Sequence, residues 1–217
     1  MTANPTPAEV WTEMLKGNER FVAGEPRHPR QDAERRHELA HVQRPTAALF
    51  GCSDSRLAAE IIFDEGLGDL FVVRNAGQVI SDSVVGSLEY AVAVLDVPLI
   101  VVLGHDECGA VRAAIDSTGV DAPALPPHIW RQVAPIVPAV RRVLRAGASD
   151  GVTTETVDAD EVGRQHLQDT VGSLLQSSEL ITEAVADGRL AIVGANYRLA
   201  DGTAIPDVIV GDAGPTR

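Results

Sequence analysis

Cysteine and aromatic residues are scarce in this sequence, and long apolar runs are missing from it. The chain has 217 residues with 2 cysteines, and aromatic side chains make up 4% of it. Because residues 1–9 show no basic patch followed by an apolar stretch, we recognise no secretory signal, and two cysteines then argue against a disulfide framework. No apolar run approaches the roughly 20 residues that a membrane-spanning helix needs. We therefore expect a cytoplasmic protein with no membrane partner and a core of Val, Leu, Ile and Ala.

Basic residues are also few, which bears on the partners of the chain. Lys and Arg number 18 against 31 Asp and Glu, so the formal net charge is -13. An acidic chain repels the phosphates of nucleic acids, and the adjacent arginines at 35–36 and 141–142 are isolated pairs rather than a basic stripe. We therefore expect no nucleic-acid partner. The length predicts a single domain over 1–217, with an N-terminal helical arm at 1–42 and an α/β part at 43–217.

Apolar periodicity predicts an alternation of strands and helices. Four short apolar runs predict strands buried on both faces, at 46–51, 70–73, 98–104 and 190–194. Helical spacing predicts helices from a capping box at Thr6 and Glu9 to about 22, at 32–42, at 81–95 and at 160–187, the last ending at Gly188. The proline-rich segment 117–156 predicts a broken helix with loops, and Asp201-Gly202 predicts the turn of an edge hairpin. Strands that alternate with helices indicate a parallel α/β sheet with helices on both sides.

Side chains able to do chemistry follow three of the predicted strands. Cys52 ends the first strand region, residues 74–77 follow the second, and His105 and Cys108 follow the third. Ligands of an open parallel sheet bind beyond the carboxyl ends of its strands, so these side chains can converge. Thiolate and imidazole are ligands that zinc prefers, and three protein ligands with one open position are typical of a catalytic zinc site. Two alternatives stay open on the residues alone: cysteines that are merely small buried apolar residues, and an Asp54–Arg56 ion pair that is merely structural.

Two short blocks resemble the signature of the β-class carbonic anhydrases: Cys52-Ser53-Asp54-Ser55-Arg56 and Gly104-His105-x-x-Cys108-Gly109. Residues 71–77 look like a third family block, and the likeness extends to 17–21 and 190–194, so it covers most of the chain. In detail the chain is most similar to bacterial members of actinobacterial type. It departs from the family at Ala110, where a second glycine is frequent, and in the less usual acidic pair at 106–107.

The resemblance implies a lyase that hydrates carbon dioxide reversibly to bicarbonate and a proton. It implies one zinc ion per chain, held by Cys52, His105 and Cys108. In that family the aspartate, here Asp54, takes the fourth metal position in a closed, inactive form. In the open form it pairs with the arginine, here Arg56, and a zinc-bound hydroxide oriented by this pair attacks carbon dioxide.

The resemblance also implies a substrate pocket and an assembly. The pocket is expected at Gln43, Phe71, Ala76, Tyr90 and Gly109, the last through its backbone N–H. We expect the sheet order 2-1-3-4 with an added edge strand. The family implies self-association to a dimer or tetramer with active sites at the interface, and the first helix is expected to pack on the partner.

The charge of the expected zinc site determines the role of Asp54. Two thiolates cancel the charge of the zinc ion, so the metal is a weaker Lewis acid than one with three neutral ligands, and Asp54 must help to position the attacking group.

Three other functions are alternatives to the hydration of carbon dioxide. Hydrolysis of carbonyl sulfide or carbon disulfide by a relative of the family stays an open alternative, since substrate access separates such an enzyme from a carbonic anhydrase. A non-catalytic zinc protein is disfavoured because a structural site prefers four closed ligands. A cytidine-deaminase site is excluded because its Cys-x-x-Cys is absent.

Overall fold

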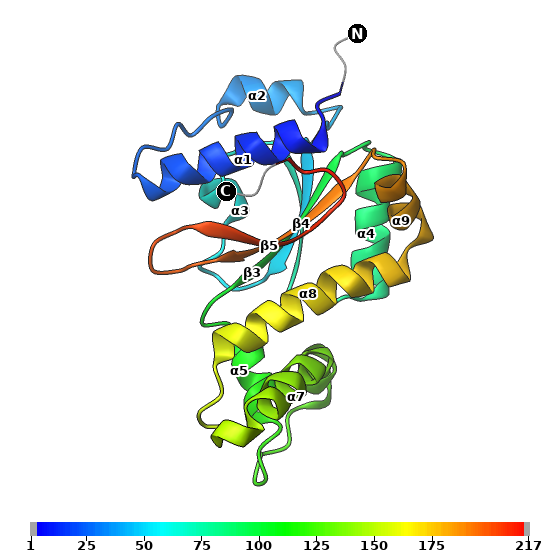
Figure 1. Cartoon of the computed structure of the whole chain (residues 1–217). Coiled ribbons are helices and arrows are strands. Elements are labelled where there is room, and N and C mark those ends of the chain that lie inside the picture. The colour runs from blue at the N-terminus through cyan, green and yellow to red at the C-terminus, as the bar shows by residue number, and fades with distance from the viewer. Residues whose placement is uncertain (1–3, 215–217) are drawn as a thin grey trace.

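A five-stranded sheet forms the centre of the protein (Figure 1). The computed structural model describes residues 4–214; residues 1–3, which belong to the stretch examined for a secretory signal, and 215–217 lie outside it. The strands follow the order β2 (Leu70–Asn75), β1 (Ala47–Cys52), β3 (Leu99–His105), β4 (Ala191–Tyr197) and β5 (Ala204–Val210). Strands β2, β1, β3 and β4 run parallel to one another, and β5 is antiparallel to β4. The predicted order, including the edge hairpin, is confirmed.

The central strands are buried because helices cover both faces of the sheet. Every residue of β1 and β3 is buried, as the unbroken apolar runs predict. The prediction of burial on both faces is wrong for β2, whose residues are only partly buried or exposed. Within residues 4–214, β2 pairs with β1 alone and forms an edge of the sheet, so one of its sides has no neighbouring strand.

The helices divide into two layers, one on each side of the sheet. On one side, α1 (Pro7–Val22) and α3 (Ala59–Ile62) cover the sheet, and α5 (Gly109–Asp116) and α7 (Val137–Ala146) extend the same apolar core beyond the carboxyl ends of the strands (Figure 1). On the other side, α4 (Asp82–Ala93) and α9 (Glu179–Ala186) lie side by side, and α8 (Ala159–Ser177) extends from them to α7 (Figure 1). Among residues 4–214, no helix combines the length and the apolar character that crossing a membrane demands.

The first helix is fixed to its own chain. Thr6 and Glu9 form the predicted capping box. Trp11 is fully buried and packs edge-on against Phe63, with ring centroids 6.3 Å apart. The Asn18 amide donates to the carbonyls of Ile62 and Gly202. The buried apolar face of α1 is therefore covered within its own chain, and the packing of this helix on a partner stays a prediction.

Two predicted helices differ from the structure in their boundaries, and the proline-rich segment agrees with its prediction. The helix predicted at 160–187 is two helices, because Ser178 leaves the helical conformation (φ -137°) and its hydroxyl caps α9 by accepting from the Ile181 amide at 3.2 Å. The helix predicted at 32–42 is the shorter α2 (Ala33–Glu38). The proline-rich segment contains α6 (Pro127–Val133), α7 and the 3-10 helices η1 (Ala134–Ile136) and η2 (Ala148–Asp150), so the expected broken helix is confirmed.

Candidate metal centre

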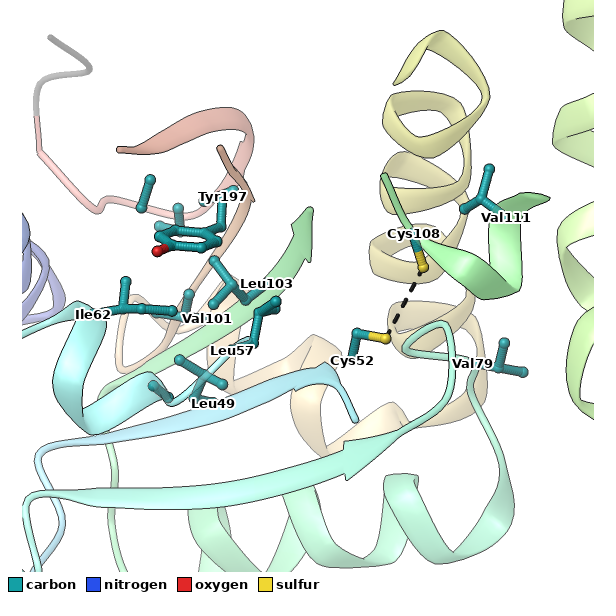
Figure 2. Packing of buried hydrophobic residues seen from close by; sticks show 14 of the residues in the cluster. Leu49, Cys52, Leu57, Ile62, Val79, Val101, Leu103, Cys108, Val111 and Tyr197 are labelled. Carbon is teal, nitrogen blue, oxygen red and sulfur yellow. Dashed lines mark hydrogen bonds between the residues drawn. The ribbon is translucent and has the colours of Figure 1, made fainter. Parts of the chain in front are cut away.

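The two cysteines and one histidine meet at the carboxyl edge of the sheet. Cys52 ends β1, His105 ends the neighbouring parallel strand β3, and Cys108 stands immediately before α5. One ligand atom from each of the three lies within 4.8 Å of the others, and all three residues are buried. The sulfur atoms of the cysteines face each other at 4.0 Å (Figure 2). The predicted convergence of strand ends therefore occurs, and the two cysteines are not merely small buried apolar residues, because they share one cluster with a histidine.

The ring of His105 is oriented for metal binding. Its Nδ1 lies 2.7 Å from the backbone oxygen of Asp106, so Nδ1–H donates there and Nε2 keeps a free lone pair. Nε2 is buried and has no hydrogen-bond partner within residues 4–214. Asp106 is itself fixed, because its carboxylate accepts from the Leu199 amide at 2.9 Å. A buried acceptor without a partner is costly, and a cation between Nε2 and the sulfurs would satisfy it.

The two thiols compete for one negative charge. Hydrogen bonding from Cys108, together with the nearby His105 ring and the Gly77 amide, lowers the pKa of the Cys52 thiol to about 4, although burial opposes this. The hydrogen bond that the Cys108 thiol donates to Cys52, together with burial and the charge on Cys52, raises the pKa of the Cys108 thiol. A divalent cation placed between the sulfurs removes this conflict, since it attracts both thiolates. The donor set of two sulfurs and one imidazole nitrogen fits zinc.

Asp54 lies beside this cluster and is held away from it by Arg56. The guanidinium forms a bidentate pair with the carboxylate, Nε to Oδ1 at 2.9 Å and Nη2 to Oδ2 at 2.8 Å. The backbone N–H of Arg56 also donates to Oδ1 at 3.0 Å. These bonds to Arg56 hold the pKa of the Asp54 carboxyl well below its usual range. In this structure Asp54 is thus an ionised acceptor bound to Arg56, and it is not part of the three-residue cluster.

The residues expected to line the substrate pocket divide into two groups. Ala76 and Gly109 lie next to the cluster: Ala76 precedes Gly77, whose amide donates to Cys52 Sγ at 3.3 Å, and Gly109 opens α5 directly after Cys108. The other three, Gln43, Phe71 and Tyr90, are not brought to it. Gln43 precedes β1 and Phe71 pairs with Ala48 near the start of that strand, whereas Cys52 ends it. Tyr90 packs against Phe71, with ring centroids 6.2 Å apart.

Two further residues support the cluster through the backbone; the sequence places them at strand ends, at 74–77 and 106–107, without indicating this role. Arg74 donates to the backbone oxygens of Cys52 at 2.9 Å and Asp54 at 2.7 Å, which fixes the loop that carries both. Asp106 positions His105 as described above. Their place at strand ends is a signal that the sequence already contains. His166, by contrast, lies on the apolar stripe of α8 and is 3% exposed, and periodicity alone does not separate such a histidine from a surface one.

Known proteins resemble this chain along most of its length. A family model described as carbonic anhydrase matches residues 47–204. Carbonic anhydrase 2 of Mycobacterium tuberculosis is 49% identical over 97% of this chain and 98% of its own length. A carbonic anhydrase of Mycolicibacterium smegmatis is 48% identical over 97% and 98%. The crystal structure of the β-carbonic anhydrase CafA of Aspergillus fumigatus aligns with a TM-score of 0.66 and 25% identity, over 95% of this chain and 92% of that one.

These likenesses agree with the fold and with the donor set at the sheet edge, which were established independently of them. The family match covers well over half of the chain, and the bacterial relatives span nearly all of it. The chain therefore belongs to the β-class carbonic anhydrases, a family of zinc enzymes that hydrate carbon dioxide.

Proposed function

We propose that the chain catalyses the reversible hydration of carbon dioxide to bicarbonate and a proton, with one zinc ion held by Cys52, His105 and Cys108. The observation that carries this proposal is the convergence of two thiols and an unpartnered, buried imidazole nitrogen within 4.8 Å. The Asp54–Arg56 pair beside them supports catalysis over a purely structural site, because a structural zinc site has four closed protein ligands.

In the proposed mechanism the metal and the side chains have separate roles. Zinc would supply Lewis acidity, which makes hydroxide available near neutral pH. Asp54, ionised and held by Arg56, only accepts hydrogen bonds, so it binds the proton of the attacking group and directs the free lone pair toward the carbon of carbon dioxide. Asp54 is proposed as a metal ligand only in an alternative form in which Arg56 has released it.

Gly109 is the proposed contact for the oxygen on which negative charge develops. Its N–H belongs to the first residue of α5, where backbone N–H groups lack helical partners. A Cβ added at this glycine would meet no atom within 4 Å, so the space beside its backbone is open. A donor aimed at developing negative charge stabilises the transition state more than the substrate. Ala76, on the loop that contacts Cys52, is proposed to line the same pocket.

We further propose that Gln43, Phe71 and Tyr90 line the pocket of a second copy in a dimer or tetramer. Gln43 lies at the far end of β1, and the six residues of that strand span about 16 Å, so Gln43 cannot reach the cluster of its own chain. Tyr90 is 45% exposed although it is aromatic and packs on Phe71, which suits an interface. Mixing Gln43→Ala with His105→Ala chains tests this, because only a shared site restores activity in hybrids.

The partners and the location follow from charge and from the two thiols. The net charge of -13 supports the absence of a nucleic-acid partner. The cysteines are both free and lie 4.0 Å apart, so an oxidising compartment would threaten the metal site. We therefore propose that the protein works in the reducing cytoplasm, with carbon dioxide and bicarbonate as its small-molecule partners.

The test of the function combines metal analysis with a stopped-flow assay of carbon dioxide hydration. The purified protein is expected to contain one zinc per chain and to hydrate carbon dioxide. Cys52→Ser and His105→Ala are expected to lose zinc and activity together, whereas His37→Ala, which removes an exposed histidine from α2, keeps both. Full activity in a metal-free protein contradicts the proposal. Turnover of carbonyl sulfide or carbon disulfide without carbon dioxide hydration would assign the site to the rival reaction.

A further inference from the structure

Two consecutive peptide groups beside the cluster are held by hydrogen bonds from two helices. The first is the peptide between Ala76 and Gly77, whose N–H donates to Cys52 Sγ at 3.3 Å. The loop that carries it is tightly turned, because Gly77 and Gln78 both have positive φ, 80° and 41°. A Cβ at Gly77 would lie 2.8 Å from the Cβ of Ala110, so the loop is also closely packed. The N–H is therefore presented to the sulfur by a loop with little freedom to move.

The first support comes from α6 and acts on the same peptide group. The Gln132 side-chain amide donates to the Ala76 carbonyl at 2.8 Å. That carbonyl and the N–H of Gly77 belong to one peptide, so the hydrogen bonds form a continuous chain from Gln132 to Cys52 Sγ. Hydrogen bonds linked through one polar group polarise and strengthen each other. Gln132 thus makes the N–H a better donor to the sulfur.

The second support comes from α8 and holds the next peptide group. His166 Nε2 lies 2.7 Å from the Gly77 carbonyl, and because a carbonyl only accepts, Nε2 must carry the proton. His166 is 3% exposed, and burial lowers the pKa of its ring, so the ring is neutral. Its Nδ1 has no hydrogen-bond partner within residues 4–214. A leucine would fill this space without burying an unpartnered nitrogen, so the bond to Gly77 is the distinctive contribution of the histidine.

We propose that Gln132 and His166 are positioning residues, which hold the Gly77 amide on Cys52 Sγ and thereby reduce the charge that this thiolate donates to the bound metal. The inference rests on the proposed zinc site. It addresses a weakness of that site, since two thiolates neutralise a divalent ion and lower its Lewis acidity. A hydrogen bond to one sulfur withdraws part of that charge and restores some of the acidity.

The experiment compares four variants in cobalt-loaded and zinc-loaded protein. His166→Leu and Gln132→Leu remove the two donors, His166→Gln keeps a donor at the former Nε2, and Gln168→Leu is a matched control that removes an exposed glutamine from α8. Loss of either donor is expected to shift the sulfur-to-cobalt charge-transfer band to longer wavelength and to weaken the protection of the Gly77 amide against hydrogen exchange. In zinc-loaded protein, the midpoint of the pH profile of kcat/KM is expected to rise by about half a unit, which lowers kcat/KM about 3-fold on the acid side of the profile.

The controls separate positioning from packing. His166→Gln and Gln168→Leu are expected to keep the wild-type band, exchange rate and pH profile, and all variants to keep one metal per chain. An unchanged band and pH profile in folded His166→Leu and Gln132→Leu would overturn the proposal, as would a His166→Gln variant as impaired as His166→Leu. A wild type with the cobalt band and a protected Gly77 amide, but without carbon dioxide hydration, rejects the proposed reaction and leaves this inference standing. A wild type that binds no cobalt rejects both.

Discussion

Replacing Gly77 by alanine is expected to damage both stability and the metal site. The residue has a φ of 80°, which disfavours any side chain by about 1–2 kcal/mol. The new Cβ would lie 2.8 Å from the Cβ of Ala110 and 3.0 Å from Cδ1 of Ile136, and such overpacking costs about 1–3 kcal/mol. The sum of about 2–5 kcal/mol lowers the melting temperature of a chain of this size by roughly 4–20 °C.

Thermal unfolding, metal analysis and the hydration assay together test this reasoning. A shift of the loop that relieves the contact would disturb the hydrogen bond from the Gly77 amide to Cys52 Sγ, so zinc affinity is expected to fall along with stability. Gly86→Ala is the matched control, because this glycine lies within α4 and an added Cβ meets nothing within 4 Å. Alanine there should be neutral or stabilise by about 0.5–1 kcal/mol. A Gly77→Ala protein that melts at the wild-type temperature refutes the argument from the tight turn.

Three further substitutions have expected outcomes. Asp54→Asn should lower kcat by roughly 100-fold, the scale of a lost preorganised hydrogen bond in an active site, while zinc stays at one per chain. Stopped-flow kinetics with metal analysis checks this, and loss of zinc would contradict it. Burial and the charge of Asp69 raise the pKa of Glu65 to about 7 from 4.5. The folded state then binds this proton more tightly, so the contribution of Glu65 to the free energy of unfolding falls as pH rises from about 4.5 to 7. Urea titrations across this range should show a smaller fall for Glu65→Gln, and an identical fall would exclude Glu65 as its source. A Cβ in Gly17→Ala would lie 1.8 Å from the carbonyl oxygen of Phe63, so α1 must lift and the urea midpoint should drop; an unchanged midpoint would show that α1 does not need this contact.

The strands and the candidate metal ligands were accessible from the sequence because each rests on a local pattern. Unbroken apolar runs identify buried parallel strands, and parallel strands bring their carboxyl ends together, which places Cys52 beside His105. The division of the long C-terminal helix was missed because apolar spacing continues across Ser178. The signal for that division is a capping hydroxyl, which is weaker than the apolar periodicity around it.

The supports of the site were less accessible, because they depend on contacts between distant segments. Gln132 and His166 each contact the loop at 76–77 across more than 50 positions of sequence, and nothing local to either residue indicates that contact. For Gln43 and Tyr90 the sequence does contain a signal, but that signal is incomplete. Their spacing from the ligands agrees with the family, but spacing does not say whether a residue serves its own chain or another copy.

The position of the ligands in the chain has a consequence for how the protein is made. Cys52 and Cys108 are separated by 56 positions, and the strands that carry the cluster must pair in parallel before the sulfurs meet. Closing such long loops is slow, because entropy is lost before the contacts form. The groups that fix the ligands, among them His166 and the Leu199 amide, lie in the second half of the chain and leave the ribosome last. Tight binding of the proposed zinc ion is therefore expected only late in the synthesis of each chain, once the whole sheet has assembled.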